Sequence, residues 1–144
     1  MIRKVHHVSY VVHDLEAVMT FLRVHFGMEP TWVGAEERGR LEVTYDIGDA
    51  ELQIKQPLSD QSGLAAFLRD RGPGIHHVAW AASGLDALAA NLSASGVALR
   101  EGPLPHRSGE SSHPRLATTY RVLNVLPESG HGLGERLQIV EDDT

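Results

Sequence analysis

The sequence contains no cysteine, which excludes disulfides, zinc ribbons, thiolate catalysis and iron–sulfur clusters. It has no run of about 18 apolar residues, and its N-terminus, residues 1–4, lacks the apolar core of a signal peptide. We therefore expect a soluble, cytoplasmic protein.

Basic residues are outnumbered by acidic ones, with 13 Lys and Arg against 19 Asp and Glu and a formal net charge of −6. Such a chain would repel phosphate groups, so nucleic acids and anionic membranes are excluded as general partners.

What is present is enough for a folded core. The 144 residues suit one domain or two small fused modules, and a hydrophobic content of 42% is ordinary for a globular protein. Histidine is the unusual component, with nine residues. Four of these nine form two adjacent pairs, His6-His7 and His76-His77, and the pairs mark a duplication.

Residues 6–18 align with residues 76–88 without a gap. Both segments begin with His-His-Val, and the Leu and Ala of Leu15-Glu16-Ala17 recur in Leu85-Asp86-Ala87. The similarity extends through a complete strand-to-helix unit, which favours duplication over chance.

Each copy predicts the same order of elements. The first copy predicts a strand at 5–12, a helix from an Asp14 N-cap to Phe26, and strands at 29–34, 41–47 and 50–56. The second predicts a strand at 75–82, a helix at 84–95, and strands at 97–101, 117–126 and 135–141. The fold class is thus α+β, with two tandem βαβββ modules forming a curved mixed sheet around a metal or ligand cavity. We expect a single domain over 1–144, with module 1 at 1–58, a connecting helix within 59–73 and module 2 at 74–144.

Alternation along the strands assigns side chains to two faces of the sheet. The bulky apolar set is expected to pack under the helices: Val8, Tyr10, Val12, Leu52, Ile54, Val78, Trp80, Leu137 and Ile139. The opposite face carries small residues and one His and one Gln from each copy: His7, Gln53, His77 and Gln138. His6 and His76 face the helix side by the same alternation, and we interpret them as structural.

A single strand histidine is more often a hydrogen-bonded structural residue than a ligand. Two histidines in duplicated positions, each accompanied by an inward Gln, give the metal-ligand interpretation the same weight as the structural one. Two imidazoles with oxygen donors suit a borderline divalent cation such as Zn, Co, Ni or Mn.

The chain resembles the vicinal-oxygen-chelate superfamily, which includes glyoxalases, bleomycin-resistance proteins and extradiol dioxygenases. Within it, the methylmalonyl-CoA epimerases are the most similar group. The segments that carry this resemblance are His7-Val8 with residues 14–17, then 37–39, 47–49, 56–59, 64–68 and, most specifically, Gly74-Ile75-His76-His77-Val78-Ala79.

The resemblance implies a metal site formed by His7, Gln53, His77 and Gln138, with Glu37 at the position of a catalytic carboxylate. It implies proton abstraction next to carbonyl groups, with the metal as Lewis acid and a carboxylate as base. The implied substrate is a small enolisable molecule that chelates through oxygen, and an acyl-CoA is one such substrate. A homodimer is also expected by resemblance.

Two features depart from the epimerases. Gln138 stands where the resemblance predicts a Glu that both binds metal and transfers a proton, and an amide cannot transfer protons. The segment 102–117 is longer and more basic than its counterpart. It is either a mobile surface loop or a lid in which Arg107 or Arg115 meets an anionic substrate.

Three functions remain open. The first is an epimerase-like, metal-dependent isomerase. The second is a glyoxalase-related lyase or a secondary-metabolism enzyme that uses the same site. The third is a metal-free small-molecule binding or resistance protein. An extradiol dioxygenase is less favoured, because non-haem iron is bound by two His and one carboxylate and no inward carboxylate is evident on the last strand.

Overall fold

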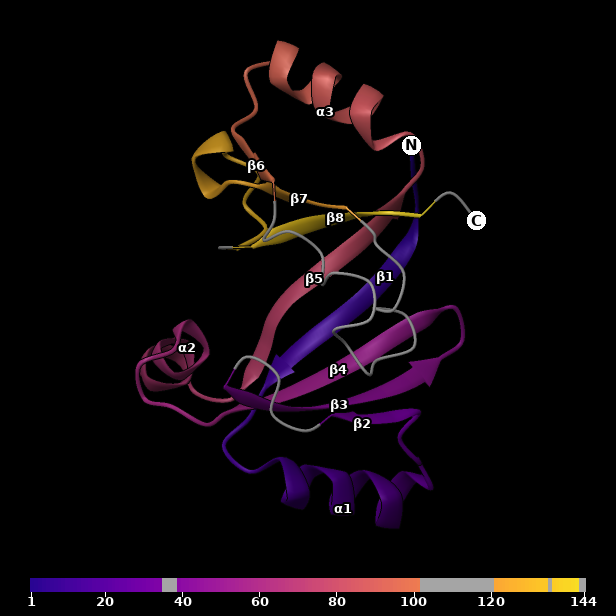
Figure 1. The fold of residues 1–144 in the computed structure, drawn as a ribbon, viewed down its shortest axis with the longest axis vertical. Coiled ribbons are helices and arrows are strands. Elements are labelled where there is room, and N and C mark those ends of the chain that lie inside the picture. The colour runs from indigo at the N-terminus through magenta and orange to yellow at the C-terminus, as the bar shows by residue number, and fades with distance from the viewer. Residues whose placement is uncertain (35–38, 102–120, 135, 143–144) are drawn as a thin grey trace. The chain divides into compact units, whose positions relative to one another are not determined.

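A computed structural model describes residues 1–34, 39–101, 121–134 and 136–142 (Figure 1). The chain divides into two compact units, one formed by Val8–His76 and the other by Met1–His7 with His77–Thr144. Over the described residues, eight strands are hydrogen-bonded in the order β2-β3-β4-β1-β5-β8-β7-β6. The strands β1 (Ile2–Val11) and β5 (Gly74–Ala82) contribute residues to both units.

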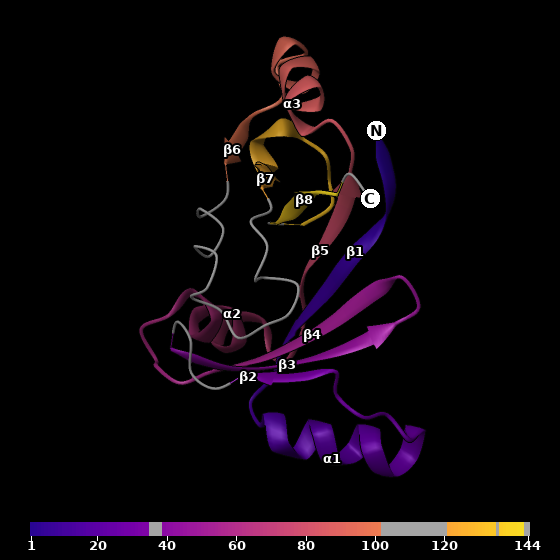
Figure 2. The same ribbon diagram turned by 45° about the vertical axis from the view of Figure 1, so that its right-hand side comes forward.

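The unit Val8–His76 contains helix α1 (Leu15–Phe26), strands β2 (Trp32–Gly34), β3 (Arg40–Ile47) and β4 (Ala50–Pro57), and helix α2 (Gly63–Arg71). The strands β2, β3 and β4 pair antiparallel in sequence order. Helix α1 lies along one face of this sheet in both ribbon views (Figure 2). The helix and the sheet enclose a hydrophobic core. Its buried residues are Val12, Leu15, Val43, Tyr45 and Ile54, and the partly buried Tyr10, Val18, Met19, Leu22, Met28, Leu41 and Leu52 pack against them.

Local signals in the sequence explain where α1 begins and ends. The Asp14 side chain accepts a hydrogen bond from the Ala17 amide at 3.0 Å, which satisfies one of the unpaired N–H groups of the first turn. The Gln56 side chain on β4 accepts another from the Leu15 amide at 2.8 Å. Gly27 ends the helix in the left-handed conformation, with φ of 64°.

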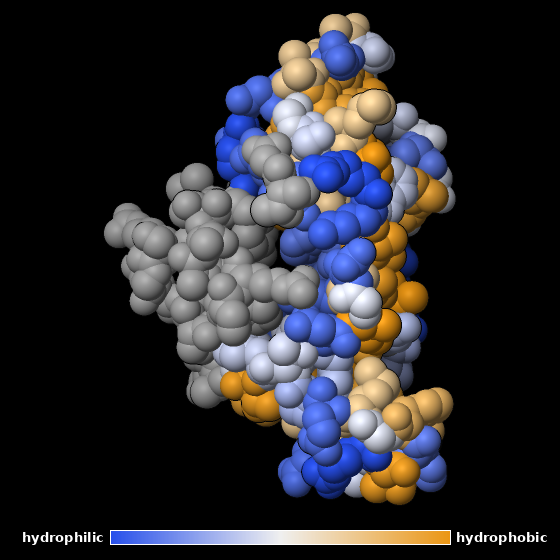
Figure 3. Space-filling view, turned by 90° about the vertical axis from the view of Figure 1, so that its right-hand side faces the viewer, coloured by the Kyte–Doolittle hydropathy of each residue, from blue (hydrophilic) through white to orange (hydrophobic). Residues whose placement is uncertain are grey.

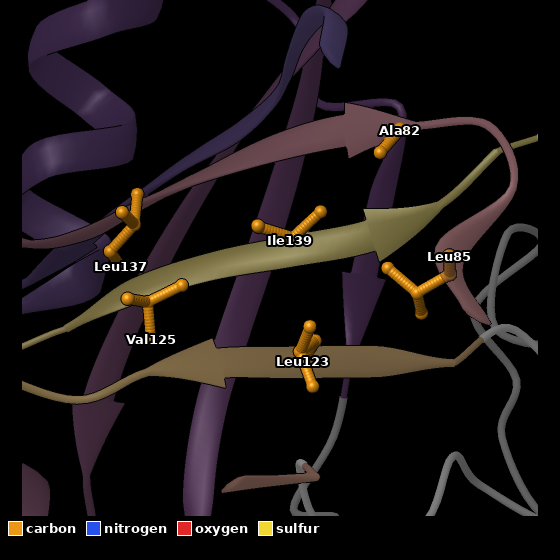
Figure 4. Close-up of a cluster of buried hydrophobic side chains, with 6 residues drawn as sticks. All are labelled: Ala82, Leu85, Leu123, Val125, Leu137 and Ile139. Carbon is orange, nitrogen blue, oxygen red and sulfur yellow. The ribbon is translucent and has the colours of Figure 1, made fainter. Parts of the chain in front are cut away.

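The other unit contains helix α3 (Leu85–Ala94), strands β6 (Leu99–Glu101), β7 (Val122–Val125) and β8 (Leu137–Glu141), and a short 3-10 helix at Pro127–Ser129. Strand β8 is parallel to β5 and antiparallel to β7. Six buried side chains form the core of this unit: Ala82, Leu85, Leu123, Val125, Leu137 and Ile139 (Figure 4). Helix α3 packs on them through Leu88, Ala89 and Leu92.

The predicted α+β class and mixed sheet are confirmed, with each half following the order strand, helix, three strands. The predicted connecting helix is α2. The predicted strand at 117–126 is described only from residue 121, and strand 135–141 begins at Leu137. Among the described residues, no helix is long and apolar enough to span a membrane.

The predicted packing faces are largely confirmed. Tyr10, Val12, Leu52 and Ile54 belong to one core, and Trp80, Leu137 and Ile139 to the other. Phe26 differs, because the helical spacing of Val18, Leu22 and Phe26 places it on the buried face of α1, but it is 66% exposed. It lies in the last turn before Gly27, where the helix ends. Together with the exposed Phe21 and Val24, it adds apolar surface to α1. The space-filling view shows orange hydrophobic surface beside blue hydrophilic surface at the bottom of the molecule (Figure 3).

Candidate functional site

The first feature of the candidate site is a pair of buried histidines from β1 and β5. His7 Nε2 and His77 Nε2 lie 3.1 Å apart, and the two rings meet edge to face with centroids 5.2 Å apart. Both side chains are buried, with 4% and 7% of their surface exposed. These are the two equivalent positions of the duplicated segment, so the fold brings together residues that are far apart in the sequence.

The separation of the two nitrogens suits a shared cation. Metal ions such as zinc bind imidazole nitrogen at about 2.0–2.1 Å, which places two neighbouring ligand nitrogens roughly 2.9–3.4 Å apart for angles of about 90–109°. The 3.1 Å between His7 Nε2 and His77 Nε2 falls in this range. The same separation also suits a hydrogen bond between two neutral rings. The donor set therefore fits a divalent cation without requiring one.

Gln138 lies on the same face as His77. Strand β8 pairs with β5 so that Gln138 is opposite Ala79, two residues along from His77. Paired residues in a sheet point to the same side. The pairing from Leu137 to Glu141 continues without a break, which puts Glu141 on the opposite face, as alternation predicts.

Asn124 is a residue of this face that the sequence analysis did not name. It pairs with Gln138 across β7 and β8, it is only 5% exposed, and its Nδ2 lies 3.5 Å from the Arg100 carbonyl. The side-chain amide of Asn124 therefore lies beside that of Gln138. The signal that could have identified it was the alternation in Val122–Val125, where Leu123 and Val125 pack under the helix and Asn124 between them faces away.

Gln53 belongs to the other unit, on β4. It is 6% exposed, and its Nε2 donates a hydrogen bond to Glu51 Oε1 at 2.8 Å. Glu51, which is 2% exposed, was also not named by the sequence analysis. Residues two apart on a strand share a face, so alternation places Glu51 beside Gln53. A buried carboxylate thus accompanies the predicted amide ligand.

The β3–β4 face around Gln53 is polar and buried. Thr44 pairs with Gln53, and Glu42 pairs with Lys55. Thr44 is only 1% exposed, and Glu42 and Lys55 are each 7% exposed. Buried ionisable groups are costly unless they are paired, and they concentrate at functional sites. This face of the unit Val8–His76 therefore carries chemistry-bearing groups where α1 does not cover it.

Two predicted features lie outside the described residues. Glu37 falls within 35–38, and the basic segment with Arg107 and Arg115 falls within 102–120. In the ranges that are described, no three His, Cys, Asp or Glu side chains gather into a possible metal cluster. The predicted ligand set contains only two residues of those types, His7 and His77, because its other members are glutamines.

Two buried hydroxyl groups have no hydrogen-bond partner within the described residues. Ser9 Oγ belongs to a fully buried residue on β1, and Tyr45 Oη lies in the core under α1. Burial raises the pKa of the Tyr45 phenol above its ordinary value of 10.0, since the charged form would lose its solvation, and Glu29 adds to the same shift.

Comparisons with known proteins identify the family of the chain. The model of the Glyoxalase/Bleomycin resistance protein/Dioxygenase superfamily matches residues 6–113. The chain belongs to this superfamily, and the resemblance found in the sequence is confirmed. No curated protein sequence matches the chain.

Solved structures show the same fold. A methylmalonyl-CoA epimerase from Mycobacterium tuberculosis is similar with a TM-score of 0.75 and 27% identity, over 99% of this chain and 90% of that chain. A variant of the Streptomyces coelicolor methylmalonyl-CoA epimerase, in complex with 2-nitronate-propionyl-CoA, has a TM-score of 0.73 and 24% identity over 100% of both chains. A hypothetical protein from Bacillus halodurans has a TM-score of 0.76 and 22% identity, over 98% of this chain and 95% of that one.

Proposed function

We propose that the protein is a metal-dependent enzyme of the epimerase type, which removes a proton from the carbon next to the carbonyls of an acyl-CoA or similar substrate. The observation that carries this proposal is the 3.1 Å separation of His7 Nε2 and His77 Nε2, two buried imidazoles from duplicated positions. The similarity to methylmalonyl-CoA epimerase structures, some with acyl-CoA compounds bound, supports the reaction class and the substrate class.

His7 and His77 would hold the cation, with Gln138 and Gln53 as further oxygen ligands. The bound cation would supply Lewis-acid stabilisation of negative charge on the substrate oxygens. An amide can bind an ion through its carbonyl oxygen but adds no charge to it. A set of two imidazoles and two amides is neutral, so we expect weaker cation binding than a set with one carboxylate would give.

The proton would be moved by carboxylates of this chain. Glu37 is proposed as the base, following the resemblance. Gln138 cannot accept or return a proton, so the second proton donor of an epimerase has to be another group. The residues named so far therefore support proton exchange on one face of the carbon most directly.

Two measurements on the full chain test this proposal. Titration with Co, Mn, Ni and Zn should show uptake by the natural protein and a loss of at least tenfold in affinity for both His7→Ala and His77→Ala. His25→Ala, which removes an exposed histidine of α1, is the matched control and should bind as the natural protein does. The proposal is wrong if the natural protein binds none of these ions.

Solvent-deuterium exchange addresses the reaction itself. Incubation with methylmalonyl-CoA in D2O should place deuterium at the carbon between the two carbonyls, and Glu37→Gln should abolish this exchange. Exchange with a glutathione adduct or another oxygen-chelating compound, and none with methylmalonyl-CoA, would instead favour a glyoxalase-related enzyme on the same site.

The neutral Gln138 favours a second candidate, a small-molecule binding or resistance protein that uses no metal. In that case the histidine pair is a hydrogen bond between neutral rings. Ligand binding that is unchanged by chelators, together with an absence of turnover, would support this candidate.

Two further proposals concern the assembly and the domain organisation. The first is that the protein is a homodimer, which sedimentation would test. The second is that 1–144 is one domain with modules at 1–58 and 74–144, which limited proteolysis would test.

A further inference from the structure

His6 contacts the ring of the neighbouring histidine on β1. His6 Nδ1 and His7 Nδ1 lie 2.8 Å apart, with the rings edge to face at a centroid distance of 5.1 Å. Because His7 Nε2 also faces His77 Nε2 at 3.1 Å, three imidazoles form a chain in the order His6, His7, His77. All three belong to the unit Met1–His7 with His77–Thr144.

The two contacts restrict where the protons of His7 are. A neutral imidazole has one N–H donor and one acceptor nitrogen. If His7 Nδ1–H donates to His6 Nδ1, then His7 Nε2 carries a lone pair directed toward His77. If His6 Nδ1–H donates to His7 Nδ1, then His7 Nε2 carries the hydrogen and donates it toward His77. Only the first arrangement presents His7 Nε2 to a cation.

We propose that His6 is a positioning residue that holds His7 in the Nδ1–H tautomer, so that Nε2 of His7 is the atom presented to a divalent cation. This inference rests on the proposed metal-dependent function and assigns a partner within it. Metal-binding histidines almost always donate their second ring N–H to an acceptor, which fixes the ring orientation and the tautomer. A neutral His6 with its hydrogen on Nε2, the form that imidazole favours in water, supplies that acceptor through Nδ1.

The chain of contacts also predicts what happens at His77. Without a cation, His7 Nε2 accepts a hydrogen bond, so His77 carries its hydrogen on Nε2. If both residues held a cation, both Nε2 atoms would have to present lone pairs, and the hydrogen of His77 would move to Nδ1. We therefore expect cation binding to change the tautomer of His77 and to leave the tautomer of His7 unchanged.

The duplicated segment provides a matched control. His76 occupies the position equivalent to His6, but its ring packs edge to face on Phe67 of α2, with centroids 5.0 Å apart. The two residues thus have the same type and the same place in the repeat, with different ring contacts. The His76→Ala variant should lose packing against Phe67 and leave the nitrogens of His7 as they are.

The experiment is nitrogen-15 NMR of the imidazoles of the full chain, recorded without metal and with zinc. The natural protein should show His7 as the Nδ1–H tautomer in both states. His6→Ala should give a mixture of His7 tautomers and a zinc affinity about 10–100-fold weaker. His6→Asn, whose amide oxygen can accept the same hydrogen bond, should recover most of the affinity and the tautomer. His76→Ala should match the natural protein in the signals of His7.

Two results would overturn the inference: a natural protein in which His7 carries its hydrogen on Nε2, or a His6→Ala variant with the natural tautomer and affinity. The second result, with zinc still bound, leaves the proposed function intact. If the natural protein takes up no zinc but its His7 is Nδ1–H only while His6 is present, the proposed function fails and the positioning contact is supported.

Discussion

Gln53 donates its side-chain amide to the carboxylate of Glu51 at 2.8 Å, between two residues of β4 that are 6% and 2% exposed. The contact determines how the amide is used. With Nε2 directed to Glu51, the carbonyl oxygen of Gln53 points elsewhere and is the acceptor that this side chain presents. A hydrogen bond inside a protein contributes about 0.5–1.5 kcal/mol between neutral groups and about 1.5–3 kcal/mol where one partner is charged.

The first prediction concerns this pair. Glu51→Ala and Gln53→Ala each remove one partner of a buried hydrogen bond, so their effects on the free energy of unfolding should not add. We expect a coupling of about 1–3 kcal/mol in a double-mutant cycle measured by urea denaturation. The pair Gln61→Ala and Glu51→Ala, which joins an exposed side chain to the same buried carboxylate, is the control and should be additive. Additivity for the buried pair would contradict the prediction.

Strand β4 also shows how much of the structure the sequence predicts. Alternation placed Leu52 and Ile54 in the core and Gln53 opposite them, and the structure confirms these assignments. Glu51 was not predicted, because the predicted site consists of residue types that recur in both halves of the duplication. Arg136 stands two residues before Gln138, as Glu51 stands two residues before Gln53, so this carboxylate does not recur in the second half. Its spacing from Gln53 was nevertheless sufficient to place it on the same face.

The contact between His6 and His7 shows a different limit. Strand alternation assigns neighbouring residues to opposite faces and describes only the direction of the Cα–Cβ bond. It contains no side-chain torsions, so it could not predict that two adjacent imidazoles meet through their Nδ1 atoms at 2.8 Å. Phe26 shows a third limit, since periodicity predicts which face of a helix is buried but not whether that face stays covered in the last turn.

The second prediction concerns Tyr45, whose hydroxyl lies in the α1 core without a hydrogen-bond partner in the described part of the chain. Removing an unsatisfied buried polar group recovers part of its desolvation cost, about 1–3 kcal/mol. Tyr45→Phe should therefore keep or raise the free energy of unfolding near neutral pH. Tyr10→Phe, a partly buried residue of the same core, is the matched control.

The pH dependence of the same variant follows from the raised pKa of Tyr45. In the unfolded chain the phenol ionises near its ordinary pKa of 10.0, whereas the folded protein keeps it neutral to a higher pH. The unfolded state therefore binds fewer protons there, and stability falls as the pH rises above that value. Denaturation curves between neutral pH and pH of about 11 should show a steeper alkaline loss for the natural protein than for Tyr45→Phe. Parallel curves would contradict this assignment.

The third prediction concerns the start of α1. Asp14 accepts a hydrogen bond from the Ala17 amide at 3.0 Å, so Asp14→Ala should lower the free energy of unfolding by about 0.5–2 kcal/mol. Asp14→Asn keeps a good capping oxygen without the charge, and it should lie much closer to the natural protein. If the Asn variant is destabilised as much as the Ala variant, charge near the helix terminus matters more than the hydrogen bond.

The last prediction concerns Gln138, the neutral residue on the face of β8 that it shares with His77 of β5. Two imidazoles and a carboxylate attract a divalent cation more strongly than two imidazoles and an amide, because the carboxylate adds a full negative charge. Gln138→Glu should therefore raise the affinity for zinc or cobalt by at least about tenfold, a change of roughly 1.4 kcal/mol in binding free energy. Gln61→Glu makes the same chemical change at an exposed position and should leave the affinity within about twofold, because surface charges are screened.

Deuterium exchange extends this comparison from binding to chemistry. A carboxylate at position 138 would also restore a group that can return a proton to the substrate, so Gln138→Glu should convert one-sided exchange of methylmalonyl-CoA into net epimerisation. Tighter metal binding with unchanged chemistry would place residue 138 among the ligands and away from the reacting carbon. An unchanged metal affinity in Gln138→Glu, combined with a loss in His77→Ala, would remove residue 138 from the ligand set. The natural glutamine would then be a feature of the substrate surface, where its amide and that of Asn124 present donors and acceptors to a polar ligand.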